Sequence, residues 1–204
     1  MKFIKKNYIY LFLIVIIVVV FFFPFKKRGY KRIGSELTIS EHSEERQKFS
    51  IRAYGYIVKI NKKLSKEDAL SIINNTWNAS QERGRDPYFY LAIARVESGF
   101  ILGAEGKHGE IGLWQMKVKT AKYISSGLIT NKKMRRLLRK PFFSINIGSG
   151  HLEDLIDMFD GNIIKALMAY NCGASKVKGK NIPDGTYEHI TKVMTSYYEL
   201  KKDE

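Results

Sequence analysis

A closely spaced set of helix start and stop signals in the middle of the chain constrains the fold more than any other feature. Ser65 is placed to cap one helix and Gly84 to end it. Asp86 and Pro87 then provide the cap and the first turn of a second helix, which Gly99 ends. No stretch of the chain shows sustained period-two alternation of apolar residues. The sequence therefore predicts a mostly α-helical domain.

Further helices are expected on both sides of this pair. A weakly periodic segment at residues 41–60 precedes it, and the later helical segments are expected near 117–126, 131–139, 144–159, 162–171 and 187–201. Residues 101–112 contain four glycines, which predicts a loop that turns repeatedly or a short irregular hairpin. We therefore expect one domain over residues 45–204.

The N-terminal end of the chain has a different composition. An uncharged, apolar run at residues 8–25 lies between basic flanks and is just long enough to cross a bilayer as a helix. A cleaved signal peptide is the alternative, but the run ends in FFFPFKKR, which offers no small-residue cleavage site. We expect a basic end at residues 1–7, one transmembrane anchor at 8–25 and a linker at 26–44.

The chain is strongly basic. It has 35 Lys and Arg against 20 Asp and Glu, which gives a formal net charge of +15. Such a surface attracts nucleic acid, anionic lipid or acidic wall polymers, but the sequence contains no nucleic-acid motif, so no nucleic-acid partner is expected. Charge is densest in NKKMRRLLRK at 131–140, which predicts either a solvated helix face or a contact for anionic lipid heads.

Glu97 has an unusual place for a carboxylate. It falls in the last turn of the helix that Gly99 ends, where the negative end of the helix dipole disfavours a second negative charge. Its neighbours are apolar, and burial would disfavour the charged form further. A carboxyl group that keeps its proton can act as a general acid. Taken alone, however, Glu97 is better explained as a solvent-facing side chain at a frayed helix end.

Three short motifs and two longer segments follow one another along the chain in the order found in a known family. The motifs are Glu-Ser at 97–98, Gly-Leu-Trp-Gln at 112–115 and Ala-Tyr-Asn at 169–171. The segments are INIGSGHLEDL at 145–155 and IPDGTYEHITKV at 182–193. Together they resemble the soluble lytic transglycosylase family, which has the lysozyme-like fold of goose-type lysozyme.

The resemblance implies a helical domain with an active-site cleft that cleaves the MurNAc-GlcNAc β-1,4 bond of peptidoglycan glycan strands. Glu97 would be the single catalytic acid and base. It would protonate the bridging oxygen and then accept the proton of the muramic acid 6-hydroxyl, which leaves a 1,6-anhydro ring. No metal or cofactor is expected. The resemblance also implies substrate contacts from Ser98, Gln115, Tyr170, Asn171 and Tyr187.

Three residues leave alternatives open. Ser98 either bonds a sugar or only caps the turn after its helix. Trp114 stands where the family usually has Met, and its ring either stacks on a sugar or belongs to the core. Cys172, the one cysteine of the chain, stands where Ala is common. Because no paired histidine is indicated, we expect it to be a small buried residue rather than a nucleophile.

The nearest rival function is a hydrolysing muramidase on the same fold. Most glycosidases use two carboxyl groups, and no pattern singles out the second among Glu105, Glu110, Asp154 and Asp157. A further rival is an idle peptidoglycan-binding scaffold, although an idle module has no need of Glu97.

The substrate also predicts where the protein lies. Peptidoglycan is outside the cytoplasmic membrane, so we expect a cytoplasmic N-terminus, a single membrane crossing and an extracytoplasmic catalytic domain. The basic flanks on both sides of the apolar run do not decide this orientation by themselves.

Overall fold

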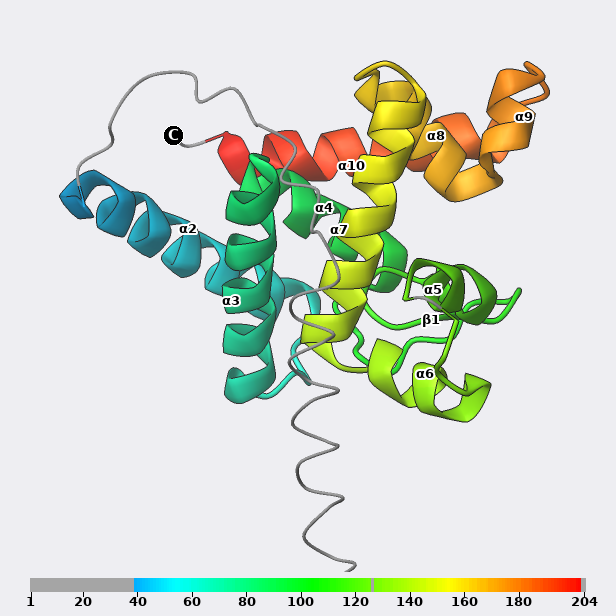
Figure 1. The fold of residues 1–204 in the computed structure, drawn as a ribbon. Coiled ribbons are helices and arrows are strands. Elements are labelled where there is room, and N and C mark those ends of the chain that lie inside the picture. Colours follow the sequence, from blue (N-terminus) through cyan, green and yellow to red (C-terminus); the bar gives the residue numbers. More distant parts are fainter. Residues whose placement is uncertain (1–38, 126, 203–204) are drawn as a thin grey trace, which may run out of the picture. The chain divides into compact units, whose positions relative to one another are not determined.

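The computed structural model describes residues 39–125 and 127–202 (Figure 1). The helices before the sheet are α2 (Ile39–Ile60), α3 (Lys66–Arg83) and α4 (Pro87–Ser98). A small antiparallel sheet follows, formed by β1 (Glu110–Ile111) and β2 (Met116–Lys117). The helices after it are α5 (Val118–Ile124), α6 (Asn131–Leu138), α7 (Pro141–Met158), α8 (Ile163–Cys172), α9 (Ala174–Lys178) and α10 (Asp184–Lys201).

The prediction of a mostly α-helical domain is confirmed, and the helix boundaries follow the predicted signals. The Ser65 side chain accepts a hydrogen bond from the backbone N–H of Asp68, and the Asp86 side chain caps α4 in the same way. Gly84 and Gly99 end α3 and α4 in the left-handed conformation, with φ of 62° and 57°. These ends were predictable because each is made by a few neighbouring residues.

The N-terminal predictions are largely outside the described residues. The basic end at 1–7, the anchor at 8–25 and residues 26–38 of the linker belong to this part of the chain. The first described helix, α2, begins at Ile39, inside the segment predicted as linker. Over the ranges that the structure describes, no helix combines the length and apolar composition needed to cross a membrane.

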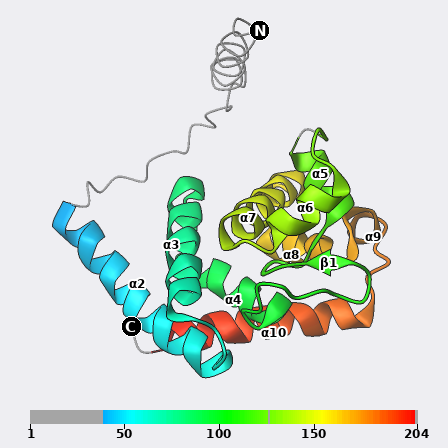
Figure 2. The same ribbon diagram turned by 90° about the horizontal axis from the view of Figure 1, so that it is seen from below.

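Helix α4 is enclosed on all sides. Seven consecutive residues of α4, at 88–94, are buried. The reason is that α2 and α3 pack against α4 while α10 runs along it (Figure 2). A helix surrounded in this way has no solvent face, so a Tyr or Ala at any position is buried. Glu97 therefore lies at the end of the most enclosed helix.

A buried ionic network fixes α7 to the turn before α4. Glu153 of α7 accepts two parallel hydrogen bonds from the Arg85 guanidinium, at 2.9 and 2.8 Å, and a third from the Tyr90 hydroxyl at 2.9 Å. Burial, and then the Glu153 charge, raises the pKa of Tyr90, so its hydroxyl stays a donor. A buried carboxylate is tolerated when its oxygens are satisfied in this way.

Gly112 is required by a close approach of two backbone segments. Its φ is 83°, and a Cβ at this position would lie 1.9 Å from the carbonyl oxygen of Leu138 at the end of α6. Gly109 has the same φ of 83°, but nothing lies within 4 Å of the place where its Cβ would be. Gly109 is therefore favoured only by its left-handed backbone, whereas Gly112 is required both by its left-handed backbone and by the lack of space for a Cβ.

The Gly109→Ala and Gly112→Ala variants should differ in stability. Both substitutions place a Cβ on a left-handed backbone, which costs about 1 kcal/mol. Gly112→Ala adds a clash with backbone atoms and should lower the free energy of unfolding by a further ~1–3 kcal/mol. Urea denaturation of both variants beside the unchanged protein measures the difference. Equal losses would contradict the close contact with Leu138.

Candidate active site

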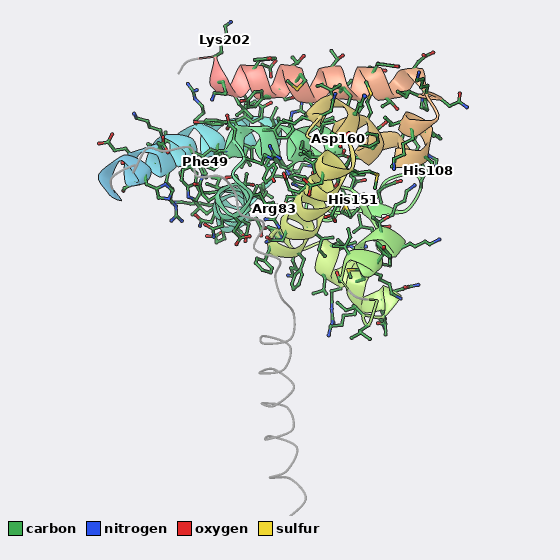
Figure 3. All side chains as sticks on the ribbon, turned by 45° about the horizontal axis from the view of Figure 1, so that its top comes forward. Phe49, Arg83, His108, His151, Asp160 and Lys202 are labelled. Carbon is green, nitrogen blue, oxygen red and sulfur yellow. The ribbon has the colours of Figure 1, made fainter. Side chains whose placement is uncertain are left out.

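A cleft of about 580 Å³ opens between the sheet and helices α7 and α8. Glu97 reaches it from the end of α4. The loop and sheet contribute His108, Glu110, Gln115, Met116 and Lys117, and α5 contributes Thr120. The remaining lining residues come from α7, α8 and the turn after α8: His151, Leu155, Met158, Ala169, Tyr170, Asn171, Cys172, Gly173 and Ala174. Figure 3 shows His108 and His151, which reach this region from different elements.

Glu97 is partly buried and hydrogen-bonded. Its side chain is 13% exposed, and its Oε1 lies 3.0 Å from Nε2 of His189 on α10. Gly99 ends α4 with its N–H donating to the Arg95 carbonyl, which directs the chain away two residues after the acid. The Ser98 hydroxyl donates to the Ala94 carbonyl at 3.0 Å, so it is used within the helix.

His189 of α10 contacts Glu97, although none of the sequence motifs indicated this residue. The family resemblance pointed instead to Tyr187, whose side chain is 50% exposed and does not line the cleft. Residues two apart on a helix point about 200° apart, so Tyr187 and His189 cannot both face α4. A signal was present, since His189 shares helical spacing with the buried Val193 and Leu200.

Gln115 both lines the cleft and holds the loop before it. Its Nε2 donates to the carbonyl oxygens of Ala104 at 3.2 Å and Gly112 at 2.8 Å. Its backbone has a φ of 44°, an uncommon value for a residue with a side chain. Because both amide hydrogens go to the loop, Oε1 is the atom that Gln115 has left to offer a ligand.

Trp114 and Tyr170 pack together behind the cleft. Trp114 is 0% exposed and stacks edge-on against Tyr90 and Tyr170, so the structure places it in the core. The Tyr170 hydroxyl donates to the Trp114 carbonyl oxygen at 2.7 Å. Burial, and secondly the charge of Glu97, raises the pKa of Tyr170 well above its usual value. Tyr170 therefore contributes a neutral aromatic wall.

Asn171 and Cys172 end α8 beside the cleft. The Asn171 Oδ1 accepts a hydrogen bond of 2.9 Å from the Thr186 hydroxyl of α10, which leaves the two amide hydrogens available to a ligand. Cys172 is half-buried. Across the described ranges, no group of three or more His, Cys, Asp or Glu residues is arranged to hold a metal ion.

Glu110 is the carboxylate that shares the cleft with Glu97. Of the four acids considered from the sequence, all within the described residues, it is the one that lines the cleft. Burial alone would raise the pKa of Glu110, but N–H donors of Glu110 and His108 and the Lys117 ammonium lower it. Glu105 instead pairs with Arg135 of α6 and with Arg139, which directly follows α6.

Known proteins resemble this chain over its helical domain. Residues 74–192, more than half of the chain, match the transglycosylase SLT domain. The chain belongs to the SLT domain family. This SLT protein is 29% identical over 149 residues to a putative soluble lytic murein transglycosylase of Haemophilus influenzae, and the match covers 70% of this chain. It is 33% identical over 85 residues, or 42% of this chain, to the peptidoglycan transglycosylase gp16 of Escherichia phage T7. It spans 24% of the first relative's length and 6% of the second's.

Two solved structures share the fold of this SLT protein. The lytic transglycosylase Slt of Pseudomonas aeruginosa, solved as an inactive mutant, aligns with a TM-score of 0.56 and 23% identity, over 63% of this chain and 24% of its own. The 70 kDa soluble lytic transglycosylase of Escherichia coli aligns with a TM-score of 0.51 and 19% identity, over 80% of this chain and 34% of its own. The expected lysozyme-like helical fold is therefore confirmed.

The stability of the SLT domain should depend on His151. Burial, opposed in part by Asp154, lowers the pKa of His151 from its usual 6.5, so the unfolded chain binds a proton more readily than the folded one. Stability should therefore fall as the pH drops from about 7.5 to about 5.5. His151→Gln should flatten this dependence, which urea denaturation at the two pH values measures. An equal pH dependence in both proteins would refute the assignment.

Proposed function

We propose that the SLT protein is a peptidoglycan lytic transglycosylase that cleaves the MurNAc-GlcNAc β-1,4 bond and forms a 1,6-anhydro-muramoyl product. The observation that carries the proposal is a partly buried carboxyl group, Glu97, at the end of a buried helix and in the lining of a cleft of about 580 Å³. The relatives named as murein or peptidoglycan transglycosylases support the same substrate class.

In this proposal Glu97 performs both proton transfers. It first gives a proton to the bridging oxygen, and the bond from that oxygen to the muramic acid C1 breaks. The carboxylate that results then takes the proton of the 6-hydroxyl, whose oxygen bonds to C1. Glu97 is protonated again at the end, and no water is consumed. One carboxyl group suffices because its two roles follow each other.

The other cleft residues are proposed to hold the glycan. Gln115 offers an amide oxygen and Asn171 offers amide hydrogens, which suit the hydroxyl and N-acetyl groups of the sugars. Tyr170 offers its ring, since its hydroxyl already bonds the Trp114 carbonyl.

Hydrolysis is the second candidate, and Glu110 is the observation that favours it. Glu110 is an ionised carboxylate in the same cleft as Glu97. In a muramidase it would help a water molecule, instead of the 6-hydroxyl, to attack C1. The two reactions differ by one water in the product.

Mass spectrometry of purified peptidoglycan digested with the protein tests this choice. The unchanged protein should release products one water lighter than hydrolysis products. Glu97→Gln keeps the size of the side chain but has no proton to give, so release should fall by about 10²–10⁴-fold. Glu110→Gln should leave the anhydro product unchanged. Hydrated products that disappear in Glu110→Gln would establish a muramidase, and binding without products would indicate a scaffold.

We further propose that the protein is held at the cytoplasmic membrane by residues 8–25, with the SLT domain on the outer side. The uncharged run between basic flanks and the location of peptidoglycan support this. Helix α6 would add a contact with anionic lipid heads through a groove lined by Thr130, Lys132, Lys133, Arg135, Arg136 and Arg139. Each basic residue near an anionic surface contributes about 1 kcal/mol.

Cell fractionation separates the two contributions to membrane binding. The full chain should stay with membranes in about 1 M salt, which screens surface charges. A variant without residues 1–25 should bind membranes weakly and be released by the salt. Adding Lys133→Glu and Arg136→Glu to this variant should abolish its remaining membrane binding. Protease added outside the cytoplasmic membrane should remove a C-terminal tag. A salt-released full chain, or a protected tag, would contradict the proposal.

A further inference from the structure

We propose that His189 is a positioning residue for Glu97, and that its neutral imidazole donates a hydrogen bond from Nε2–H to Oε1 of the carboxyl group. This bond would hold Oε1 away from the substrate and leave Oε2 as the atom that gives and takes protons. The hydrogen bond itself does not depend on the proposed function, whereas its role in turnover does.

The position of His189 is fixed by the way α10 packs on α4. The two helices run antiparallel, side by side (Figure 2). At one end, Asp86 accepts hydrogen bonds from the Tyr197 hydroxyl at 2.8 Å and the Lys201 ammonium at 3.0 Å. At the other end, His189 lies 3.0 Å from Glu97. A histidine held between two packed helices, with its side chain 15% exposed, has little freedom to turn away.

The surroundings of the imidazole favour one protonation state. Nδ1 of His189 is buried and has no hydrogen-bond partner among the described residues. Two of the three possible states of the ring have a proton on Nδ1: the charged imidazolium, which is protonated on both nitrogens, and the neutral Nδ1–H tautomer. Either state buries an N–H group without an acceptor, which is more costly when the ring is charged. The remaining state is the neutral ring with its proton on Nε2, which points at Glu97.

A neutral donor at Oε1 serves both charge states of the acid. When Glu97 is protonated on Oε2, its Oε1 is a carbonyl oxygen that accepts a hydrogen bond from the Nε2–H of His189. When Oε2 has given its proton to the bridging oxygen, the same hydrogen bond acts on a full carboxylate and becomes stronger. A bond that strengthens as the charge develops accelerates the step. His189 keeps its own proton throughout, so proton balance is unchanged.

The other groups around Glu97 do not replace this donor. The Tyr170 hydroxyl is committed to the Trp114 carbonyl, and the Ser98 hydroxyl to the Ala94 carbonyl. Among the described residues, His189 is thus the side chain that lies within hydrogen-bond distance of the Glu97 carboxyl group.

Two substitutions at position 189 test the role in turnover of peptidoglycan by the full chain. His189→Gln places an amide N–H where Nε2 lies but cannot carry a charge, and His189→Leu removes the donor. We expect kcat to fall about 100-fold in His189→Leu with little change in KM. His189→Gln should stay within about tenfold of the unchanged protein and keep its pH profile. Thr195→Ala, an exposed change on α10, is the control.

The nitrogen NMR shifts of the full chain, labelled at histidine, test the hydrogen bond without any turnover. The signals lost in His189→Gln identify the residue. At neutral pH they should show a protonated Nε2 and a bare Nδ1. A doubly protonated ring or a proton on Nδ1 would overturn the proposal, as would His189→Gln being as slow as His189→Leu. If no variant or unchanged protein turns over peptidoglycan, the proposed function fails, while the NMR result still decides the bond.

Discussion

The attachment of α10 to both ends of α4 is the interaction on which the rest of the site depends. Two carboxylates make it: Asp86 at the start of α4 holds Tyr197 and Lys201, and Glu97 at its end bonds His189. The first is structural and also caps α4. The second uses the side chain that is proposed to do the chemistry. The acid is therefore held by the same packing that buries α4, and its place in the cleft does not rely on a mobile loop.

This arrangement also offsets the physical cost of placing an acid there. A carboxylate in the last turn of a helix faces the negative end of the helix dipole and gains no favourable charge interaction there. The Nε2–H of His189, 3.0 Å from Oε1 of Glu97, supplies part of the hydrogen bonding that water would otherwise provide. The network of Arg85, Tyr90 and Glu153 fixes α7, which lines the cleft, to the beginning of α4.

Much of the fold was predictable because helix ends are local. Ser65, Gly84, Asp86 and Gly99 each set a boundary with a few neighbours, and Glu97 followed from its place before Gly99. The α9 helix was missed because five residues are too few to show a period.

The remainder of the site depends on contacts between residues far apart in the chain. Trp114 is buried because Gly148 of α7 leaves room for it: a Cβ there would lie 2.7 Å from the indole. His189 lies beside Glu97 because α10 presents to α4 the face that also buries Val193. Glu110 has different surroundings from Glu97. Its Oε2 accepts a hydrogen bond from the His108 N–H, and its Oε1 lies 3.4 Å from the Lys117 ammonium. A carboxylate stabilised in this way is a weak base. The cleft therefore contains two carboxyl groups in different settings, one beside the His189 ring and one beside an ammonium group and a backbone N–H donor.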